Sequence, residues 1–231
     1  ERNLTVEPLD WDITVGLSYN ASKDDQTGTL DTRVRGAGEN FRKHIAKLFF
    51  DALDKGDAVT TYGACYDGLS FFNDAHIDPG ADYQTGQDNN LALPLTLSNF
   101  KTVRSAARTF LDDRGEPVDF MHNLIVCHPD EEYEAAQIAD NSTDYETTDR
   151  ANNPWAGKTT YIESPYITSG EWHYVAAQYT QKPVYIAMRE QPALQSAWFD
   201  PNAGDGGQFY FKFYGRYDMF YGDWRLAIKG T

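Results

Sequence analysis

The N-terminal part of the chain alternates between apolar and polar residues over positions 11–19. The apolar positions are Trp11, Ile13, Val15, Leu17 and Tyr19. This period of two predicts a strand with one apolar face. The polar stretch that follows, residues 20–28, is predicted to be a loop.

Apolar residues recur at helical spacing from Val34 to Leu53. Asp31 or Thr32 is placed to cap the first turn, and Gly56 follows the end of the pattern. The pattern predicts a helix of about twenty residues and ~30 Å. That is long for a globular domain.

Glycine and proline punctuate residues 62–97, which predicts an extended loop. Loops of this length usually have a function. A second helix is predicted to begin at Ser98 and to end before Gly115 and Pro117. Its predicted buried residues are Phe100, Val103, Ala107, Phe110 and Leu111.

The second half of the chain has mainly strand character. An apolar strand at 123–127 precedes a helix that starts near Pro129 and ends near Asp140, and 141–153 is predicted to be a loop. Further strands are predicted at 159–162, 172–179, 183–189, 208–217 and 221–228. The chain is therefore predicted to belong to the α+β class.

The 231 residues suffice for one large domain or two closely packed ones, and 41% of them are apolar. A net charge of −15, from 20 Lys+Arg against 35 Asp+Glu, weighs against wrapping nucleic acid. No apolar run is long enough to cross a bilayer, so no membrane partner is expected. Cys65 and Cys127 are expected to be ordinary buried thiols. The chain begins at Glu1 without a methionine or a visible signal peptide, so we expect that an N-terminal segment has been removed or left out.

The search for catalytic chemistry finds only weak patterns. His76 lies between two aspartates in residues 74–78 and could bind a metal, but a structural histidine in a loop is the better interpretation. Cys127 and His128 are neighbours on a predicted strand and would point to opposite faces. The glutamates within 131–134 could serve a glycosidase, but they suit the first turn of a helix better. We therefore predict no catalytic residues, no cofactor and no metal.

Aromatic and basic residues are interleaved in segment 209–231. Such a mixture could form a base-stacking platform for single-stranded nucleic acid. The alternative is a pair of strands whose aromatic side chains line a core and a subunit contact. The acidity of the rest of the chain favours the alternative.

Several short motifs resemble the Mu-like major head (capsid) protein family of tailed phages. The most specific is residues 65–72, CYDGLSFF, followed by His76. Other similarities lie at 11–18 with the acidic pair at 24–25, at 49–53, at 124–126 with Pro129, at 134–136, and at 153–154, 164–166 and 223–227.

The resemblance implies the Hong Kong 97-like major capsid fold, with a long spine helix, peripheral and axial domains and an extended loop. The implied segments are 1–30 for part of the extended loop and a peripheral-domain strand, 31–60 for the spine helix, 61–205 for mainly the axial domain with a long loop, and 206–231 for strands that return to the peripheral domain. On this mapping residues 1–19 correspond to the returning strand of the extended loop, so an N-terminal arm and the outgoing strand are expected to be missing.

The resemblance also implies a non-enzymatic function. The chain would assemble with itself into hexamers and pentamers of an icosahedral shell that encloses double-stranded DNA. Portal, scaffold or decoration proteins would be further partners. The location would be the virion, after assembly in the host cytoplasm.

Inter-subunit contacts are expected in 11–19 and 62–97. The residues that we expect to make them are Trp11, Ile13, Tyr19, Tyr66, Phe71 and Phe72. A competing hypothesis is a secreted carbohydrate-active or carbohydrate-binding protein with a cleft lined by Trp172, Trp198 or Trp224 beside a carboxylate. Another is an encapsulin-like shell that houses protein cargo.

Overall fold

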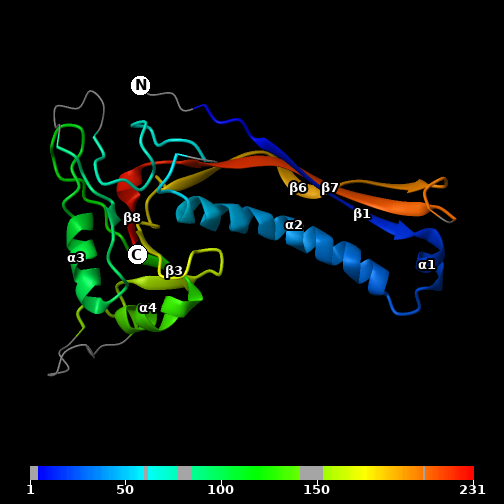
Figure 1. Cartoon of the computed structure of the whole chain (residues 1–231), viewed down its shortest axis with the longest axis horizontal. Helices are drawn as coiled ribbons and strands as arrows, with labels where there is room; N and C mark the ends of the chain where they lie inside the picture. The colour runs from blue at the N-terminus through cyan, green and yellow to red at the C-terminus, as the bar shows by residue number, and fades with distance from the viewer. Residues whose placement is uncertain (1–4, 60–61, 78–84, 141–152, 205) are drawn as a thin grey trace. The chain divides into compact units, whose positions relative to one another are not determined.

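The chain divides into two compact units in the computed structural model, which describes residues 5–59, 62–77, 85–140, 153–204 and 206–231. Unit 1 comprises Phe50–Tyr185 and Phe220–Thr231, and unit 2 comprises Thr5–Phe49 and Ile186–Met219. The chain passes from one unit to the other within α2, β6 and β7, whose courses can be followed in Figure 1. The unit boundary at Met219 falls inside the predicted segment 206–231, and the axial and peripheral names stay a prediction.

Unit 2 contains a three-stranded layer in the order β1-β7-β6, in which β1 and β7 are antiparallel. Its strands are β1 (Leu9–Ser18), β6 (Val184–Asp200) and β7 (Gln208–Tyr221). β1 pairs with β7 from Leu9 opposite Tyr217 to Ser18 opposite Gln208, and Figure 1 shows the two side by side. The strand predicted from alternation at 11–19 is therefore confirmed, although it begins two residues earlier and ends one residue sooner.

The segment predicted to be a loop at 20–28 instead contains a short helix, α1 (Tyr19–Asp24). The chain then turns through Gly28, whose φ of 71° suits glycine, into α2 (Thr29–Asp54). The carboxylate of Asp25 accepts hydrogen bonds from the backbone N–H groups of Leu30 and Thr27. These bonds, the one from Leu30 foremost, lower the pKa of Asp25 to about 2.

The long helix is confirmed, and it is longer than predicted, with 26 residues and ~39 Å. The prediction that Asp31 or Thr32 caps this helix is wrong, because the helix begins at Thr29, before both residues. Asp31 lies inside the helix, where it pairs with Arg35 at 2.7 Å. Thr32 donates from its backbone and its side chain to Gly28 O, and the carboxylate of Asp25 takes the capping role.

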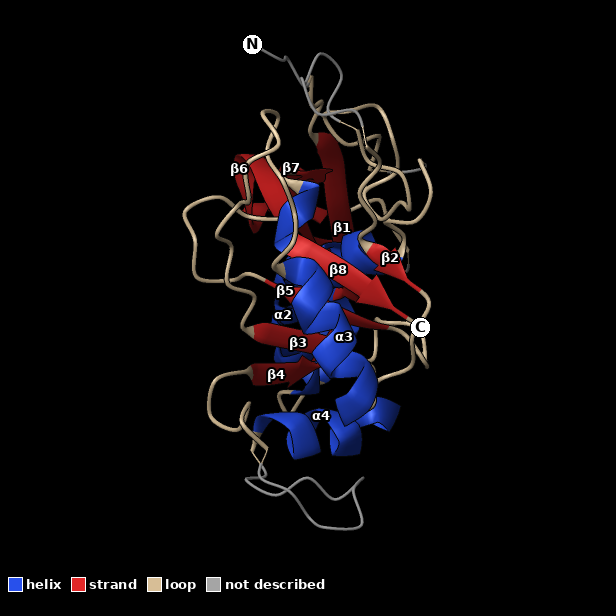
Figure 2. Ribbon diagram, turned by 90° about the vertical axis from the view of Figure 1, so that its left-hand side faces the viewer, coloured by secondary structure: helices blue, strands red, loops and turns tan. Residues whose placement is uncertain are grey.

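Unit 1 is built on a five-stranded mixed sheet in the order β2-β8-β5-β3-β4. The strands are β2 (Asn90–Leu91), β3 (Leu124–Cys127), β4 (Thr160–Glu163), β5 (Trp172–Val175) and β8 (Ala227–Gly230). Figure 2 shows α3 (Leu97–Ala107) and α4 (Glu132–Ala139) on the same side of this sheet. All four residues of β5 and of β8 are buried, so the centre of the sheet is the core of unit 1.

Helix α3 is confirmed with a different start and end. The side chain of Thr96, rather than Ser98, caps it by accepting from the backbone N–H of Asn99 at 3.2 Å. It ends at Ala107 because residues 110–118 form a separate turn through Gly115, closed by the bond from Val118 N–H to Phe110 O. Phe110 is buried as predicted, but it lies outside the helix.

The strand predicted at 123–127 and the helix after Pro129 are confirmed as β3, a 3-10 turn (Pro129–Glu131) and α4. The strand predicted at 221–228 is wrong in its first half, where a 3-10 turn (Trp224–Leu226) precedes β8. The strand predicted at 172–179 ends at Val175. Most of the loop predicted at 141–153 lies outside the described residues.

The largest error concerns β6, which was predicted at 183–189 and extends to Asp200. Its second half is exposed on both faces, so burial imposes no alternation there. β6 is an edge strand, and an edge tolerates Pro192 within the strand. No helix in the described parts of the chain is long and apolar enough to cross a membrane.

Candidate functional site: assembly surfaces and a buried loop network

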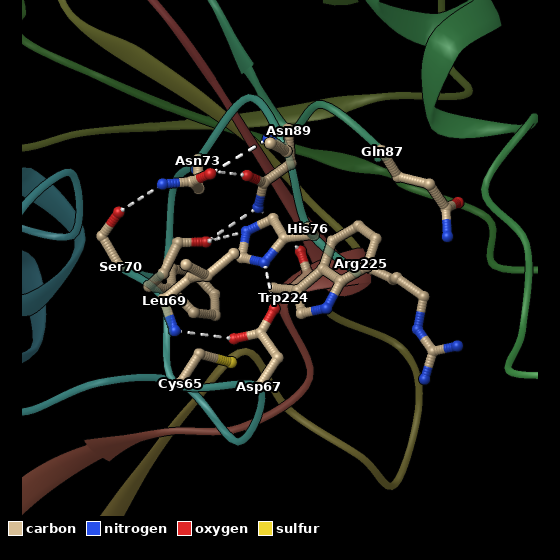
Figure 3. A network of polar contacts seen from close by, with 12 residues as sticks. Cys65, Asp67, Leu69, Ser70, Asn73, His76, Gln87, Asn89, Trp224 and Arg225 are labelled. Atoms are coloured by element: carbon tan, nitrogen blue, oxygen red, sulfur yellow. Dashed lines mark hydrogen bonds and ion pairs between the residues drawn. The ribbon is translucent and has the colours of Figure 1, made fainter. Parts of the chain in front are cut away.

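The motif at 65–72 and His76 form one buried network, shown in Figure 3. His76 is completely buried, and its Nδ1 lies 2.5 Å from Oδ2 of Asp67. Its Nε2 lies 3.2 Å from the backbone oxygen of Phe71. Both ring nitrogens therefore face oxygen atoms that can accept hydrogen bonds. The ring stacks on the indole of Trp224 at 4.3 Å and 3°.

Asp67 also holds the turn of the motif. Its second carboxylate oxygen accepts from the backbone N–H of Leu69 at 3.1 Å. Gly68 follows with a φ of 87°, a backbone conformation that residues other than glycine rarely adopt. The aspartate, the glycine and the histidine of the motif are thus explained by the geometry of a closed loop.

Asn89 ties this loop to the C-terminal segment. Its side-chain amide group lies 2.9 Å from Phe71 O, 3.1 Å from Trp224 O and 3.2 Å from Ala227 O. Its side-chain oxygen accepts from the backbone N–H of Asn73. A buried amide with these partners fixes three backbone segments that are far apart in the sequence.

The cysteines are buried and chemically quiet, as predicted. Burial, with a smaller contribution from Asp67, raises the pKa of Cys65 to about 12, and its Sγ lies 3.4 Å from Gly222 O. Burial and nearby glutamates raise the pKa of Cys127 to about 12. A thiol with such a pKa is a poor nucleophile at neutral pH.

The weak catalytic and metal patterns gain no support from the geometry. His128 accepts from the backbone N–H of Asp130 and caps the turn after β3, while Cys127 is fully buried in the sheet. Within the described residues, no three His, Cys, Asp or Glu side chains converge as a metal site would require. The second aspartate of the pair around His76, at position 78, lies outside the described residues.

Two of the predicted contact residues are placed in the core. Phe71 and Phe72 are 0% and 1% exposed. The ring of Phe71 stacks on Tyr221 at 4.7 Å, and the ring of Phe72 stacks on His173 at 5.2 Å. Neither side chain has surface left for a neighbouring subunit. We therefore correct the expectation for these two residues, which pack the interior of unit 1.

The other four predicted contact residues keep some accessible surface. Ile13 is 39% exposed on β1. Trp11 is half-buried, donates from Nε1 to Tyr217 O and meets the ring of His44 edge-on. Tyr19 is half-buried beside Phe199 and Phe209 at the start of α1. Tyr66 is half-buried in unit 1, where burial raises its pKa.

The structure adds an apolar surface on β6 that sequence reasoning missed. Its exposed members are Met188, Leu194, Trp198 and Phe199. Residues of α2, β6 and β7 also line a groove of about 470 Å³ in unit 2, with Leu194, Val34 and Phe213 among them. The apolar composition of 197–199 was the available signal, but without alternation it could not be assigned to a strand.

Three comparisons place these features among known proteins. The sequence model of the family described as phage capsid protein matches residues 4–230. No curated protein matches the sequence.

Solved structures of phage capsids share the fold at low sequence identity. A capsid chain of bacteriophage JBD30, decorated with minor capsid protein trimers, is 17% identical, with 71% of this chain and 75% of that chain covered and a TM-score of 0.57. For Mycobacterium phage Patience the identity is 11%, the coverage 97% and 69%, and the TM-score 0.60. For the capsid of myovirus phage XM1 the corresponding values are 11%, 97% and 73%, and 0.57.

The match of the family model over almost the whole chain identifies the group to which the protein belongs, and the shared mixed helix and sheet fold agrees with it. The chain belongs to the phage capsid protein family and forms the shell of a phage.

Proposed function

We propose that the chain is the major head protein of a Mu-like phage and assembles into hexamers and pentamers of an icosahedral shell. The observation that carries this proposal is the family match over residues 4–230. The Mu-like assignment rests on the motif at 65–72 with His76. The Hong Kong 97-like architecture is supported by the 26-residue helix α2, which would be the spine of the peripheral domain.

The apolar side chains of unit 2 support extensive contacts between copies. Ile13, Leu194 and Trp198 are 39%, 51% and 44% exposed on β1 and β6. Exposed apolar surface of this kind marks interaction sites. Trp11, Ile13, Tyr19 and Tyr66 remain our proposed inter-subunit contacts, joined by the β6 surface.

The charge of the chain supports a container for double-stranded DNA that does not read its sequence. A net charge of −15 repels phosphates and lets packed DNA move along the wall. We infer a purely structural function, without catalysis, in the virion after assembly in the host cytoplasm. Portal, scaffold and decoration proteins are the proposed further partners.

The carbohydrate hypothesis loses its cleft in this structure. Trp172 and Trp224 are 0% and 2% exposed and lie in the core of unit 1, where the indole N–H of Trp172 donates to Leu93 O. Only Trp198 of the three proposed tryptophans could meet a ligand. An encapsulin-like shell would share the Hong Kong 97-like fold but would hold protein cargo instead of DNA.

Size-exclusion chromatography with negative-stain electron microscopy tests the proposal. We expect closed particles and, after expression with a packaging system, nuclease-protected DNA inside them. A 26 kDa monomer under all conditions contradicts the shell, whereas particles that hold protein cargo without DNA favour the encapsulin-like alternative.

A further inference from the structure

A basic patch stands out on unit 1 of this acidic chain. Lys101 and Arg104 of α3 and Arg108, the residue that directly follows the helix in helical conformation, recur at three- and four-residue spacing and therefore share one face. The guanidinium of Arg104 lies 4.5 Å from the ring centroid of Trp155, and the ammonium of Lys158 lies 6.0 Å from it. We call these five residues the basic patch. Four of them, Lys101, Arg104, Arg108 and Trp155, line a hollow of about 400 Å³ together with Ser105.

Three cations of the basic patch have no ion-pair partner in the described part of unit 1: Arg104, Arg108 and Lys158. Arg104 is held in place by its stacking on Trp155 and by a hydrogen bond to the hydroxyl of Tyr174. Arg108 and Lys158 are exposed. A fixed guanidinium beside two exposed cations is preorganised to receive carboxylates or phosphates.

An acidic patch, made of Glu132, Glu134 and Glu163, lies at the start of α4 and the end of β4. Glu132 and Glu163 are exposed, and Glu134 is half-buried. Glu163 lies opposite Cys127 in the pairing of β4 with β3, and Glu132 and Glu134 lie in the first turn of α4, which follows β3. The described residues provide no Lys or Arg within 4.0 Å of these three carboxylates. Exposed apolar side chains surround them: Tyr133 is 69% exposed and Ile162 is 46% exposed.

The two patches lie at opposite ends of β4 and of α4. Glu163 is the last residue of β4, whereas Lys158 precedes the first residue of the strand, Thr160, by two positions. A strand of this length spans about 10 Å between its ends. Helix α4 carries Glu132 and Glu134 in its first turn, while its last residue, Ala139, accepts a hydrogen bond from the backbone N–H of Gly157, the neighbour of Lys158 in the sequence. Among the described residues, no ion pair joins the two patches.

We propose that the basic patch of one copy docks on the acidic patch of the next copy, which forms a head-to-tail contact within a ring of subunits. Patches of opposite charge at opposite ends of one layer suit a heterologous interface, which closes into a ring when its rotation closes. Trp155 on one side and Tyr133 and Ile162 on the other provide the apolar centre that such interfaces have. The inference rests on the proposed function, because it presupposes that copies of the chain assemble.

A second copy is favoured over DNA as the occupant of the basic patch. Docking of identical chains with a net charge of −15 needs local complementarity to overcome their mutual repulsion. The patch is compact and centred on one indole, whereas binding along a phosphate backbone uses an extended array of cations. Each copy also carries the unpaired carboxylates that the patch requires.

Charge-reversal variants test the contact. The variant Arg108→Glu with Lys158→Glu places acid against acid, and Glu132→Lys with Glu163→Lys places base against base. Each should reduce particle yield at least about tenfold, because facing like charges cost several kcal/mol per interface. The chain that carries all four substitutions restores complementarity with reversed polarity and should recover most of the yield. Particle yield is measured by sedimentation and negative-stain microscopy at about 0.1 M salt.

A matched control separates the contact from the general effect of charge. Arg114→Glu with Lys55→Glu changes the net charge of unit 1 by the same amount at exposed positions that belong to neither patch. Lys55 pairs with Asp51 at the surface, and such an exposed pair is worth no more than about 1 kcal/mol, so this variant should assemble like the wild type. Circular dichroism and urea unfolding of the unassembled subunits establish that each variant folds. The quadruple variant adds a second safeguard, since misfolding of a double variant would not be reversed by two more substitutions.

The possible outcomes are distinguishable. Wild-type yield in both double variants, or no recovery in the quadruple variant, overturns the inference while the proposed function stands. Normal particle yield with reduced protected DNA in the Arg108→Glu, Lys158→Glu variant also overturns it and assigns the basic patch to DNA. Failure of the wild type to form particles contradicts the proposed function, and the inference with it.

Discussion

The two units of the chain differ in how they bury their apolar side chains. Of the twelve largest fully buried side chains in the described structure, Tyr217 alone belongs to unit 2. Unit 1 encloses the others around its five-stranded sheet. Unit 2 instead exposes Leu194, Trp198 and Phe199 on an edge strand. Unit 1 therefore carries the stability of the isolated subunit, whereas the strands of unit 2 leave apolar surface exposed, which we propose that neighbouring copies cover.

The largest effect is expected from breaking the contact between Asp67 and His76 inside unit 1. Asp67→Asn removes the carboxylate charge that faces the completely buried His76 and weakens the hydrogen bond that holds the ring. Losing a buried hydrogen bond to a charged group costs about 3 kcal/mol, so the free energy of unfolding in urea should fall by about that amount. Asp74→Asn, an exposed aspartate in the same loop, serves as the control and should change it by less than about 0.5 kcal/mol. Equal effects of the two variants would contradict the role assigned to the network.

An intermediate effect is expected from pH, again in unit 1. Burial lowers the pKa of His173 from 6.5 to about 3, so this ring stays neutral in the folded chain while it is protonated below pH 6.5 in the unfolded chain. The unfolded state therefore gains a proton as the pH falls, and stability decreases. The loss amounts to about 2 kcal/mol between pH 7.5 and 5.

His173→Phe should remove this part of the pH dependence. In the described structure, neither ring nitrogen of His173 has a hydrogen-bond partner, and the ring stacks on Phe72, so phenylalanine forfeits no bond there. Urea unfolding at pH 7.5 and 5 should show a smaller difference for the variant than for the wild type. An identical difference for both chains would exclude His173 as its source.

The smallest effect on stability is expected from unit 2. Ile13→Ser with Leu194→Ser changes two exposed side chains, and the unfolding free energy should shift by no more than about 1 kcal/mol in total. Assembly should nevertheless decrease strongly, because these side chains are proposed to be buried between copies. Thr14→Ser with Gln195→Ser, at neighbouring exposed positions of the same strands, should leave particle yield unchanged. A stability loss of several kcal/mol with normal assembly would reverse the comparison between the units.

The parts of the fold that could be predicted from the sequence are those in which burial imposes a period. The strand at 11–19 and the helix from Val34 to Leu53 have such a period, and both are present in the structure. The second half of β6 has none, since it is exposed on both faces, and α1 is too short to show one. These elements depend on strand pairing and on local turns that apolar patterning does not reveal.

Prediction of the candidate site from the sequence meets the same limit. The motif at 65–72 marked an important loop, but Phe71 and Phe72 were expected to contact other subunits because long loops can reach neighbouring copies. Their actual partners, Tyr221 and His173, lie about 100 to 150 residues further along the chain. Contacts at that separation follow from the tertiary fold and could not be inferred from local spacing. The basic patch likewise combines α3 with Trp155 and Lys158, which only the fold brings together.

Hydrogen exchange in free subunits and in assembled particles tests the central claim most directly. The claim is that unit 2 is completed by neighbouring copies and that unit 1 is complete by itself. We predict that amide protection in β1 and in residues 190–200 of β6 increases strongly on assembly, while protection of residues 70–76 is already high in the free subunit and changes little. Equal exchange of β1 and β6 in free and assembled subunits would contradict this account.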